Sequence, residues 1–120
     1  MEVSVEKESP AVVKVHIAGR VTSQAWHAAL NNVAKLLKPD ERTSILLAAE
    51  GFGGWESGDW DDLSFQREND ARIARIAIVA DKRWEEQILM FAGQGLRKVD
   101  IQFFEPAETA RAREWVSSGG

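Results

Sequence analysis

An apolar run that ends in an acidic residue constrains the fold of this chain more than any other feature. Residues 75–79 read Arg-Ile-Ala-Ile-Val, Ala80 follows, and Asp81 stands where a helical pattern begins. A short continuous apolar run is typical of a strand that is covered on both faces, and aspartate is a preferred helix N-cap. The segment therefore predicts a buried parallel strand that leads directly into a helix, which places the chain in the α/β class.

The N-terminal half predicts a hairpin, a helix and another buried strand. Apolar and polar residues alternate on both sides of Pro10, which is typical of an antiparallel hairpin with one buried face. Gly19 is expected to end the second strand, and Ser23 is expected to cap the helix that follows. The run 43–49 predicts a strand, and the glycine-rich residues 51–55 predict a loop. The apolar positions of the helix are Trp26, Leu30, Val33 and Leu37.

The C-terminal half alternates helices with strands. Asp59 is expected to cap a second helix and Asp81 a third, with the strand 73–80 between them. Residues 99–104 predict the last strand, and Pro106 suits the first turn of a final helix. The order β-β-α-β-α-β-α-β-α implies right-handed crossovers, so we expect a mainly parallel sheet with the N-terminal hairpin as an antiparallel edge. The residues expected to face inward from the final helix are Ala107, Ala110 and Trp115.

Length and composition limit the classes of protein to which this chain can belong. Its 120 residues suit one domain, which we expect to span 1–116 and to leave 117–120 as a flexible tail. The absence of cysteine excludes disulfides and thiolate chemistry, and the net charge of −4 disfavours nucleic acid as a partner. No signal-like or membrane-spanning apolar stretch occurs. We therefore expect a soluble cytoplasmic protein, with peripheral contact to a membrane as an alternative.

Several stretches within residues 45–116 resemble one family of small bacterial proteins. They are Gly54-Trp55, Trp60-Asp61-Asp62-Leu63, Arg75-Ile76-Ala77-Ile78-Val79, Asp81-Lys82-Arg83-Trp84-Glu85, Phe103-Phe104 and 110–115. Together they make the chain similar to the SpoIIAA-like family, which is grouped with the STAS and Sec14-type domains. The resemblance implies a STAS-like fold, no established activity, and a tie to lipids or membranes. The sequence departs from the family pattern at Ala80, where glycine is usual, and at 66–69, which lack a histidine often seen there.

Three large aromatic residues, Phe52, Trp55 and Trp60, stand on or beside the predicted loop. Each such side chain buries roughly 150–250 Å² when it is covered, which is more apolar surface than a loop usually needs. The three residues form either a hydrophobic lid over the edge of the sheet, a flap over an apolar ligand, or a tip that touches a membrane. They are therefore candidate ligand-binding residues.

The third predicted helix carries the other candidates for ligand binding. Asp81 stands at the carboxyl end of a parallel strand, where open α/β sheets usually bind ligands, and Trp84 follows closely. The structural alternative is that Asp81 only caps the helix and that Trp84 only fills the core. The four apolar residues 88–91 cannot all face one core, so Leu89 or Met90 should meet a neighbouring segment, a ligand or a partner.

The spacing of residues argues against several kinds of site. The glycines at 51–54 do not match a dinucleotide-binding loop, because Glu56 stands where the third glycine belongs, and no P-loop motif occurs. Ser57 lacks the spacing of a nucleophile elbow. His16 and His27 have no second ligand at metal-binding spacing. We therefore expect no cofactor, no metal ion and no catalytic residue.

Three hypotheses for the function remain open. The first is a non-catalytic module that binds a small apolar ligand or a lipid surface through the Trp55 loop and the third helix. The second is a phosphorylation-controlled, partner-switching regulator like the STAS anti-sigma antagonists, with Ser57 nearest to the expected phosphorylation site and a protein as partner. The third is an enzyme with Asp81 as the base and Lys82 beside it. Both a monomer and a homodimer are compatible with the sequence.

Overall fold

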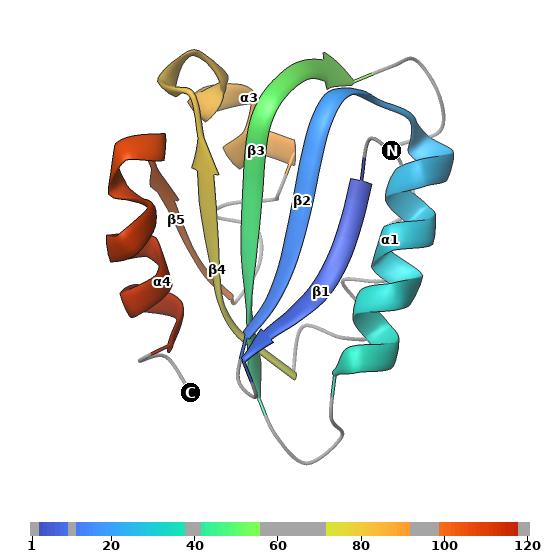
Figure 1. Cartoon of the computed structure of the whole chain (residues 1–120), viewed down its shortest axis with the longest axis vertical. Helices are drawn as coiled ribbons and strands as arrows, with labels where there is room; N and C mark the ends of the chain where they lie inside the picture. The colour runs from blue at the N-terminus through green and yellow to red at the C-terminus, as the bar shows by residue number, and fades with distance from the viewer. Residues whose placement is uncertain (1–2, 10–11, 38–41, 56–71, 92–98, 118–120) are drawn as a thin grey trace.

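The computed structural model describes residues 3–9, 12–37, 42–55, 72–91 and 99–117. Within these ranges, five strands form one sheet in the order β1-β2-β3-β4-β5 (Figure 1). The strands are β1 (Val3–Ser9), β2 (Val12–Val21), β3 (Thr43–Trp55), β4 (Ile73–Ala80) and β5 (Asp100–Phe104). β1 pairs antiparallel with β2, whereas the β2–β3, β3–β4 and β4–β5 pairs are parallel. The predicted α/β sheet with an antiparallel edge hairpin is confirmed.

Strand β4 is the apolar run that defines the fold class in the sequence. Its residues are buried with the exception of Arg75, which is half-buried. Successive residues of a strand point to opposite faces of the sheet. Ile76 and Ile78 accordingly join the larger apolar cluster, and Ala77 and Val79 join a second cluster on the opposite face. The run lacks apolar–polar alternation because both faces of β4 are covered.

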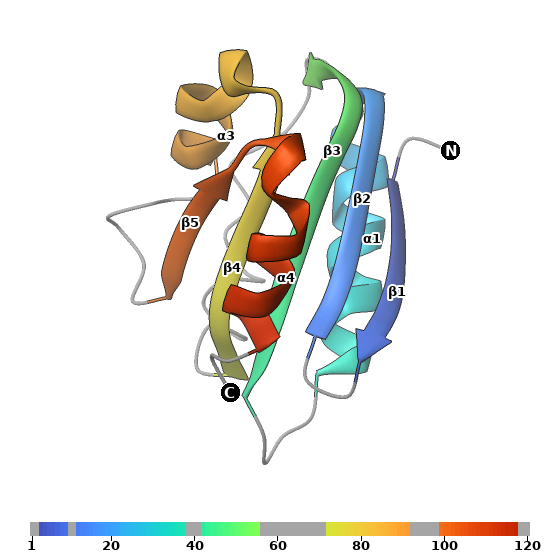
Figure 2. The ribbon, with the colours of Figure 1, turned by 60° about the vertical axis from the view of Figure 1, so that its left-hand side comes forward.

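Helices lie on both faces of the sheet (Figure 2). The larger cluster includes Ala29 and Val33 from α1 (Ser23–Leu36) and Ile88 from α3 (Glu85–Phe91). The opposite cluster includes Ala112 and Val116 from α4 (Thr109–Ser117). The sheet is therefore the middle layer of three, with α1 and α3 on one side and α4 on the other.

The residue that caps α1 is Thr22, and the prediction of Ser23 is wrong by one position. The Thr22 hydroxyl accepts the N–H of Ala25 at 3.1 Å, and the Thr22 backbone is extended, as an N-cap requires. Ser23 is already the first helical residue. The predicted inward positions of the helix divide into the buried Val33 and Leu37 and the half-buried Trp26 and Leu30.

Strands β2 and β3 both continue past the points where the sequence predicts their ends. β2 runs through Gly19 to Val21, so this glycine does not break the strand. β3 runs through the predicted loop at 51–55 and ends at Trp55. The prediction of a Trp55 loop is therefore wrong, because these residues pair with the end of β2.

Two β-bulges explain why the glycines bend the strand instead of ending it. While β2 advances three residues from Ile17 to Arg20, its partner β3 advances five residues from Ala49 to Gly54. The two extra residues of β3 are absorbed at register shifts, and Gly51 and Gly54 have φ values of 65° and 108°. Glycine adopts positive φ at little cost, and a bulge bends its strand. The carboxyl end of β3 therefore curves over, as Figure 1 shows.

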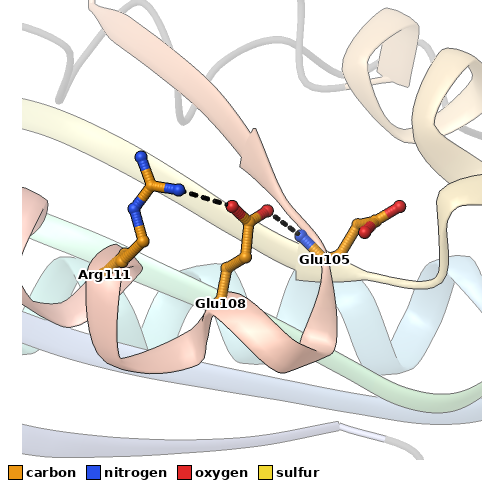
Figure 3. A network of polar contacts seen from close by, with 3 residues as sticks. All are labelled: Glu105, Glu108 and Arg111. Atoms are coloured by element: carbon orange, nitrogen blue, oxygen red, sulfur yellow. Dashed lines mark hydrogen bonds and ion pairs between the residues drawn. The ribbon is translucent and has the colours of Figure 1, made fainter.

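The final helix begins with a 3₁₀ turn, η3 (Pro106–Glu108), as the proline predicts. The Glu108 carboxylate accepts the backbone N–H of Glu105 at 3.2 Å and also accepts a 2.8 Å hydrogen bond from Arg111 (Figure 3). The first of these contacts is one half of a capping box. It satisfies a backbone donor that the start of the helix leaves without an intrahelical partner.

The inward face of α4 differs from the predicted one. Ala107 and Ala110 are exposed, whereas Ala112 and Val116 are buried and Trp115 is half-buried. The 3₁₀ turn has a tighter period than the α-helix, so the pattern from η3 does not carry over into α4. The buried positions of α4 are four residues apart, which places them on one side of the helix.

Other predicted features fall at the limits of the described residues. The last strand begins at Asp100 and not at Val99. Ser117, assigned to the tail in the sequence, is the last residue of α4. The helix predicted after Asp59 and the residues 118–120 lie outside the described ranges. In the part of the chain that the structure describes, no helix has the length and apolar character needed to cross a membrane.

Candidate functional site

Near the carboxyl ends of β2, β3 and β4, four aromatic side chains form a chain in which each ring contacts the next. We call Trp26, Phe52, Trp55 and Trp84 the aromatic row. The ring centroids are 6.2 Å apart between Trp26 and Trp55, 4.8 Å apart between Trp55 and Phe52, and 4.9 Å apart between Phe52 and Trp84. All three contacts are edge-to-face, which the charge distribution of aromatic rings favours. The row links α1, the end of β3 and the turn after β4.

The bend in β3 is what brings the row together. It carries Phe52 into the larger apolar cluster, where this side chain is only 3% exposed. Trp26, Trp55 and Trp84 are half-buried and pack against the same cluster. The structure thus gathers three candidates from the sequence, Phe52, Trp55 and Trp84. The structure adds Trp26 to these candidates. The sequence predicts this residue only as an apolar position on the inward side of α1.

Gly54 lies beside Trp84, the last ring of the row, in a backbone conformation that favours glycine. A Cβ atom at this position would lie 3.6 Å from Cη2 of Trp84, which is ordinary van der Waals contact. The backbone φ of 108° is nevertheless a conformation that other residues rarely adopt. Gly54 therefore serves the site through its backbone conformation, and not through a lack of space for a side chain.

Asp81 acts as the cap that the sequence predicts. Its Oδ1 accepts the N–H of Arg83 at 3.1 Å and starts the 3₁₀ turn η2 (Lys82–Trp84), which leads into α3. The Arg83 guanidinium carbon lies 5.2 Å from the centre of the Trp84 ring, within the range of a cation–π contact. Asp81, Lys82 and Arg83 are all exposed, so the end of the row is bordered by charged side chains.

Helix α3 packs into the same apolar cluster as the aromatic row. Ile88 is fully buried in the larger cluster, and Leu89 is half-buried against it. Two residues of the apolar run 88–91, Ile88 and Leu89, thus pack against the core of the protein itself. The side chain of Met90 lies outside the described residues, as do the candidates Trp60 and Ser57.

A second surface feature lies on the α4 side of the sheet and was missed by the sequence analysis. It is a shallow groove that is open to solvent and lined by Gln102, Phe104, Arg111, Glu114, Trp115 and Ser117. The Trp115 ring is 6.0 Å from that of Phe104. Gln102 and Phe104 alternate along β5, and the lining residues of α4 are three or four positions apart. This spacing is the only signal in the sequence that could have grouped the residues of the groove.

Among the described residues, no group of three or more histidine or carboxylate side chains lies close enough together to hold a metal ion.

Comparisons with known proteins agree with the fold. A family model described as SpoIIAA-like matches residues 12–117. A solved structure of an uncharacterised protein with a SpoIIAA-like fold, from Shewanella loihica PV-4, is similar with a TM-score of 0.70. The two sequences are 16% identical, and the match covers 95% of this chain and 91% of that one. A search of curated proteins found no match.

Two further solved structures are similar at a lower score. One is the Bacillus cell fate determinant SpoIIAA in its phosphorylated form, with a TM-score of 0.57, 16% identity, and coverage of 91% of this chain and 96% of that one. The other is the anti-sigma factor antagonist SpoIIAA in its unphosphorylated form, with a TM-score of 0.56, 14% identity, and coverage of 94% and 97%. These similarities show a shared fold.

Proposed function

This chain belongs to the SpoIIAA-like family, and we propose that it works as a non-catalytic binding module whose contact surface is the aromatic row. Its ligand is a small apolar molecule or the apolar layer of a lipid surface. One observation carries this proposal: Trp26, Trp55 and Trp84 gather at one end of the sheet and remain only half-buried.

The place and the chemistry of the row both support a binding role. Open α/β sheets usually bind ligands outside the carboxyl ends of their strands, and the row lies at that end. The side chains of Ile78 and Ile88, in the middle of the same cluster, are by contrast completely buried. Tryptophan combines a large apolar body with one N–H donor, which suits a boundary between an apolar ligand and water.

The non-catalytic part of the proposal draws support from Asp81. It offers the best case for a general base in the sequence, with Lys82 beside it. Its carboxylate accepts a backbone N–H and is exposed to solvent, which accounts for the residue as a helix cap. A general base instead needs a substrate proton within hydrogen-bond reach.

Native mass spectrometry of gently purified protein, compared with its denatured intact mass, tests the proposal. We expect an adduct that is present in the native spectrum and lost on denaturation. The Trp55→Leu variant should lose the adduct, whereas the Trp115→Leu variant should keep it, because Trp115 lies on the opposite face of the sheet. An adduct that both variants keep equally would move the ligand away from the aromatic row.

Flotation with vesicles distinguishes a lipid surface from a soluble ligand. The vesicles contain phosphatidylcholine with or without phosphatidylglycerol, and the same two variants serve as the matched pair. Binding to a surface should float the wild-type protein and the Trp115→Leu variant but not the Trp55→Leu variant. If flotation and ligand extraction are both blank, and Trp55→Leu changes stability alone, the binding-module proposal fails.

A partner-switching regulator is the second candidate function. The two SpoIIAA structures with similar folds favour it, because one is described as phosphorylated and the other as an anti-sigma factor antagonist. In the sequence, the candidate phosphorylation site Ser57 follows Trp55, the last residue of β3, by two positions. In this role the ligand of the row is a protein.

Intact mass and affinity capture test the regulatory role. The expected result is a covalent mass increase of one phosphate group that is absent from the Ser57→Ala variant. Capture of a kinase-like partner by the unphosphorylated protein should accompany it. An unmodified mass from cells together with no such partner would count against this role.

A further inference from the structure

The groove between β5 and α4 lies on the face of the sheet opposite the aromatic row (Figure 2). Its lining includes Phe104 and Trp115, whose ring centroids are 6.0 Å apart. Phe104 is buried in the apolar cluster on this face, and the half-buried Trp115 packs against the same cluster. The groove therefore has an aromatic floor that is separate from the aromatic row.

The charged side chains around this floor leave one carboxylate unbalanced. The guanidinium of Arg111 donates a 2.8 Å hydrogen bond to the carboxylate of Glu108. Arg75 lies directly opposite Asp100 in the β4–β5 ladder, so their side chains share the α4 face of the sheet. The carboxylate of Glu114 lines the groove and forms no hydrogen bond or ion pair with another described residue. The groove therefore offers a negative charge beside its aromatic floor.

The shape of the groove suits an extended peptide better than a small molecule. Sites for small molecules bury most of the surface of their ligand, which a shallow groove open to solvent does not achieve. An extended peptide needs to place only alternate side chains in such a groove, and these side chains are about 6.6 Å apart, at about 3.3 Å per residue. This spacing matches the 6.0 Å between the rings of Phe104 and Trp115.

We propose that the groove between β5 and α4 binds an extended, basic peptide segment of a partner protein. An arginine or lysine side chain of this segment lies over Trp115 and reaches the carboxylate of Glu114. The apolar side chain two residues along the peptide packs beside Phe104. A cation over a tryptophan ring is favourable, and the net charge of −4 on the chain attracts a basic partner over longer distances. This surface does not involve the aromatic row, so the inference goes beyond the proposed function and does not depend on it.

Titration with two synthetic peptides tests the inference, with NMR of the tryptophan ring N–H groups as the measurement. The probe is Gly-Ser-Arg-Ser-Leu-Ser-Gly with acetylated and amidated ends. The comparison peptide carries citrulline in place of arginine, which keeps the shape of the side chain and removes its charge. The arginine peptide should shift the signal of Trp115, which the Trp115→Phe variant identifies. The signals of Trp26, Trp55 and Trp84, which pack against the opposite cluster, should not move.

The charge of the peptide and the charge of Glu114 should both affect the affinity. The citrulline peptide should bind about tenfold more weakly, because a cation–π contact and an ion pair are lost together. Glu114→Gln should raise the Kd of the arginine peptide about three- to fivefold and leave that of the citrulline peptide unchanged. Glu86→Gln is the matched control, because it removes the same charge from an exposed position of α3, on the other face of the sheet. It should leave both values unchanged.

Three results would overturn the inference. If the arginine peptide leaves the Trp115 signal unchanged, the groove is not its binding site, and a shift of the Trp55 signal instead moves the peptide to the aromatic row. Equal affinity for the two peptides overturns the basic character of the partner. Equal effects of Glu114→Gln and Glu86→Gln reduce the interaction to long-range attraction by a negatively charged protein. The Trp55→Leu variant should bind the arginine peptide as the wild type does, so a failure of this inference is distinguishable from a failure of the proposed function.

Discussion

Arg75 holds the end of α4 through Trp115. The Arg75 guanidinium donates a 2.8 Å hydrogen bond to the backbone carbonyl oxygen of Trp115, and its central carbon lies 4.8 Å from the centre of the Trp115 ring. Carbonyl groups in the last turn of a helix lack an intrahelical donor, and a cation is favourable at that end. Arg75, the half-buried residue in the otherwise buried strand β4, thus binds the C-terminal part of α4 to the sheet.

Replacing Arg75 by alanine should therefore destabilise the protein by about 2 kcal/mol, because a charge-assisted hydrogen bond and a cation–π contact are lost together. Arg75→Lys should recover only part of this, since lysine lacks the planar guanidinium. Urea unfolding followed by circular dichroism measures both. Arg111→Ala is the control, because its ion pair with Glu108 involves a side chain that is 71% exposed and should contribute less than about 1 kcal/mol. Equal effects of the two alanine variants would contradict the role of Arg75.

Phe52→Ala should lower the free energy of unfolding by about 3–5 kcal/mol, because it removes a buried ring from the middle of the aromatic row. Phe52→Leu keeps most of the apolar volume and should cost less than half as much. Chemical unfolding at one temperature compares the two variants. An alanine variant within experimental error of the wild type would show that the Phe52 side chain is not part of the core.

The loss of stability on substitution of Gly51 should depend on how well the new residue tolerates positive φ, and not on the size of its side chain. Asparagine visits this region several-fold more often than most residues, whereas a β-branched residue rarely does. Gly51→Val should therefore be destabilising by about 1–3 kcal/mol, and Gly51→Asn by clearly less. A Cβ atom built at Gly51 would meet nothing within 4 Å, so crowding at that atom is not the cause. Thermal unfolding of the two variants provides the measurement, and equal costs would refute the argument from φ.

Asp81→Ala should cost about 1 kcal/mol through loss of the helix cap, whereas Asp81→Asn should cost much less because asparagine caps equally well. Unfolding curves for the pair separate capping from charge. If the asparagine variant loses as much stability as the alanine variant, the negative charge of Asp81 matters more than its hydrogen bond to the N–H of Arg83.

Ser44→Ala should leave the stability unchanged or raise it by up to about 1 kcal/mol. The Ser44 side chain is 1% exposed, and its hydroxyl oxygen finds no hydrogen-bond partner among the residues that the structure describes. A buried hydroxyl without a partner retains its desolvation cost. Thr109→Ala is the matched control, because the Thr109 hydroxyl donates a 2.7 Å hydrogen bond to the carbonyl of Pro106 and its loss should be destabilising. A clear loss of stability in Ser44→Ala would reveal a partner for this hydroxyl.

The class of fold could be predicted because it depends on local patterns. The buried run at 73–80, the cap at Asp81 and the proline at 106 each act within a few residues of chain, and each lies where the sequence places it. The hairpin also follows from alternation on both sides of Pro10. The residues that match the family model, 12–117, include the buried run, Asp81 and Pro106.

The candidate site was predicted only in part, because its geometry depends on partners distant in sequence. The three glycines beside Phe52 and Trp55 predict a loop. Glycine permits a turn and a bulge equally well, and pairing with the end of β2 decides in favour of the bulge. Without that pairing, the contact of Trp55 with Trp26 could not be derived.

The sequence by itself determined the α/β class, the order of the described elements, the cap at Asp81 and the start of the final helix at Pro106. Only the tertiary structure decided that β3 bends over the end of the sheet and that four aromatic rings meet there. It also decided that Arg75 fastens α4. The physical reason is that capping and periodicity are settled by residues within one or two turns of each other. Strand register and ring contacts instead depend on which strand or helix, distant in the sequence, packs beside these residues.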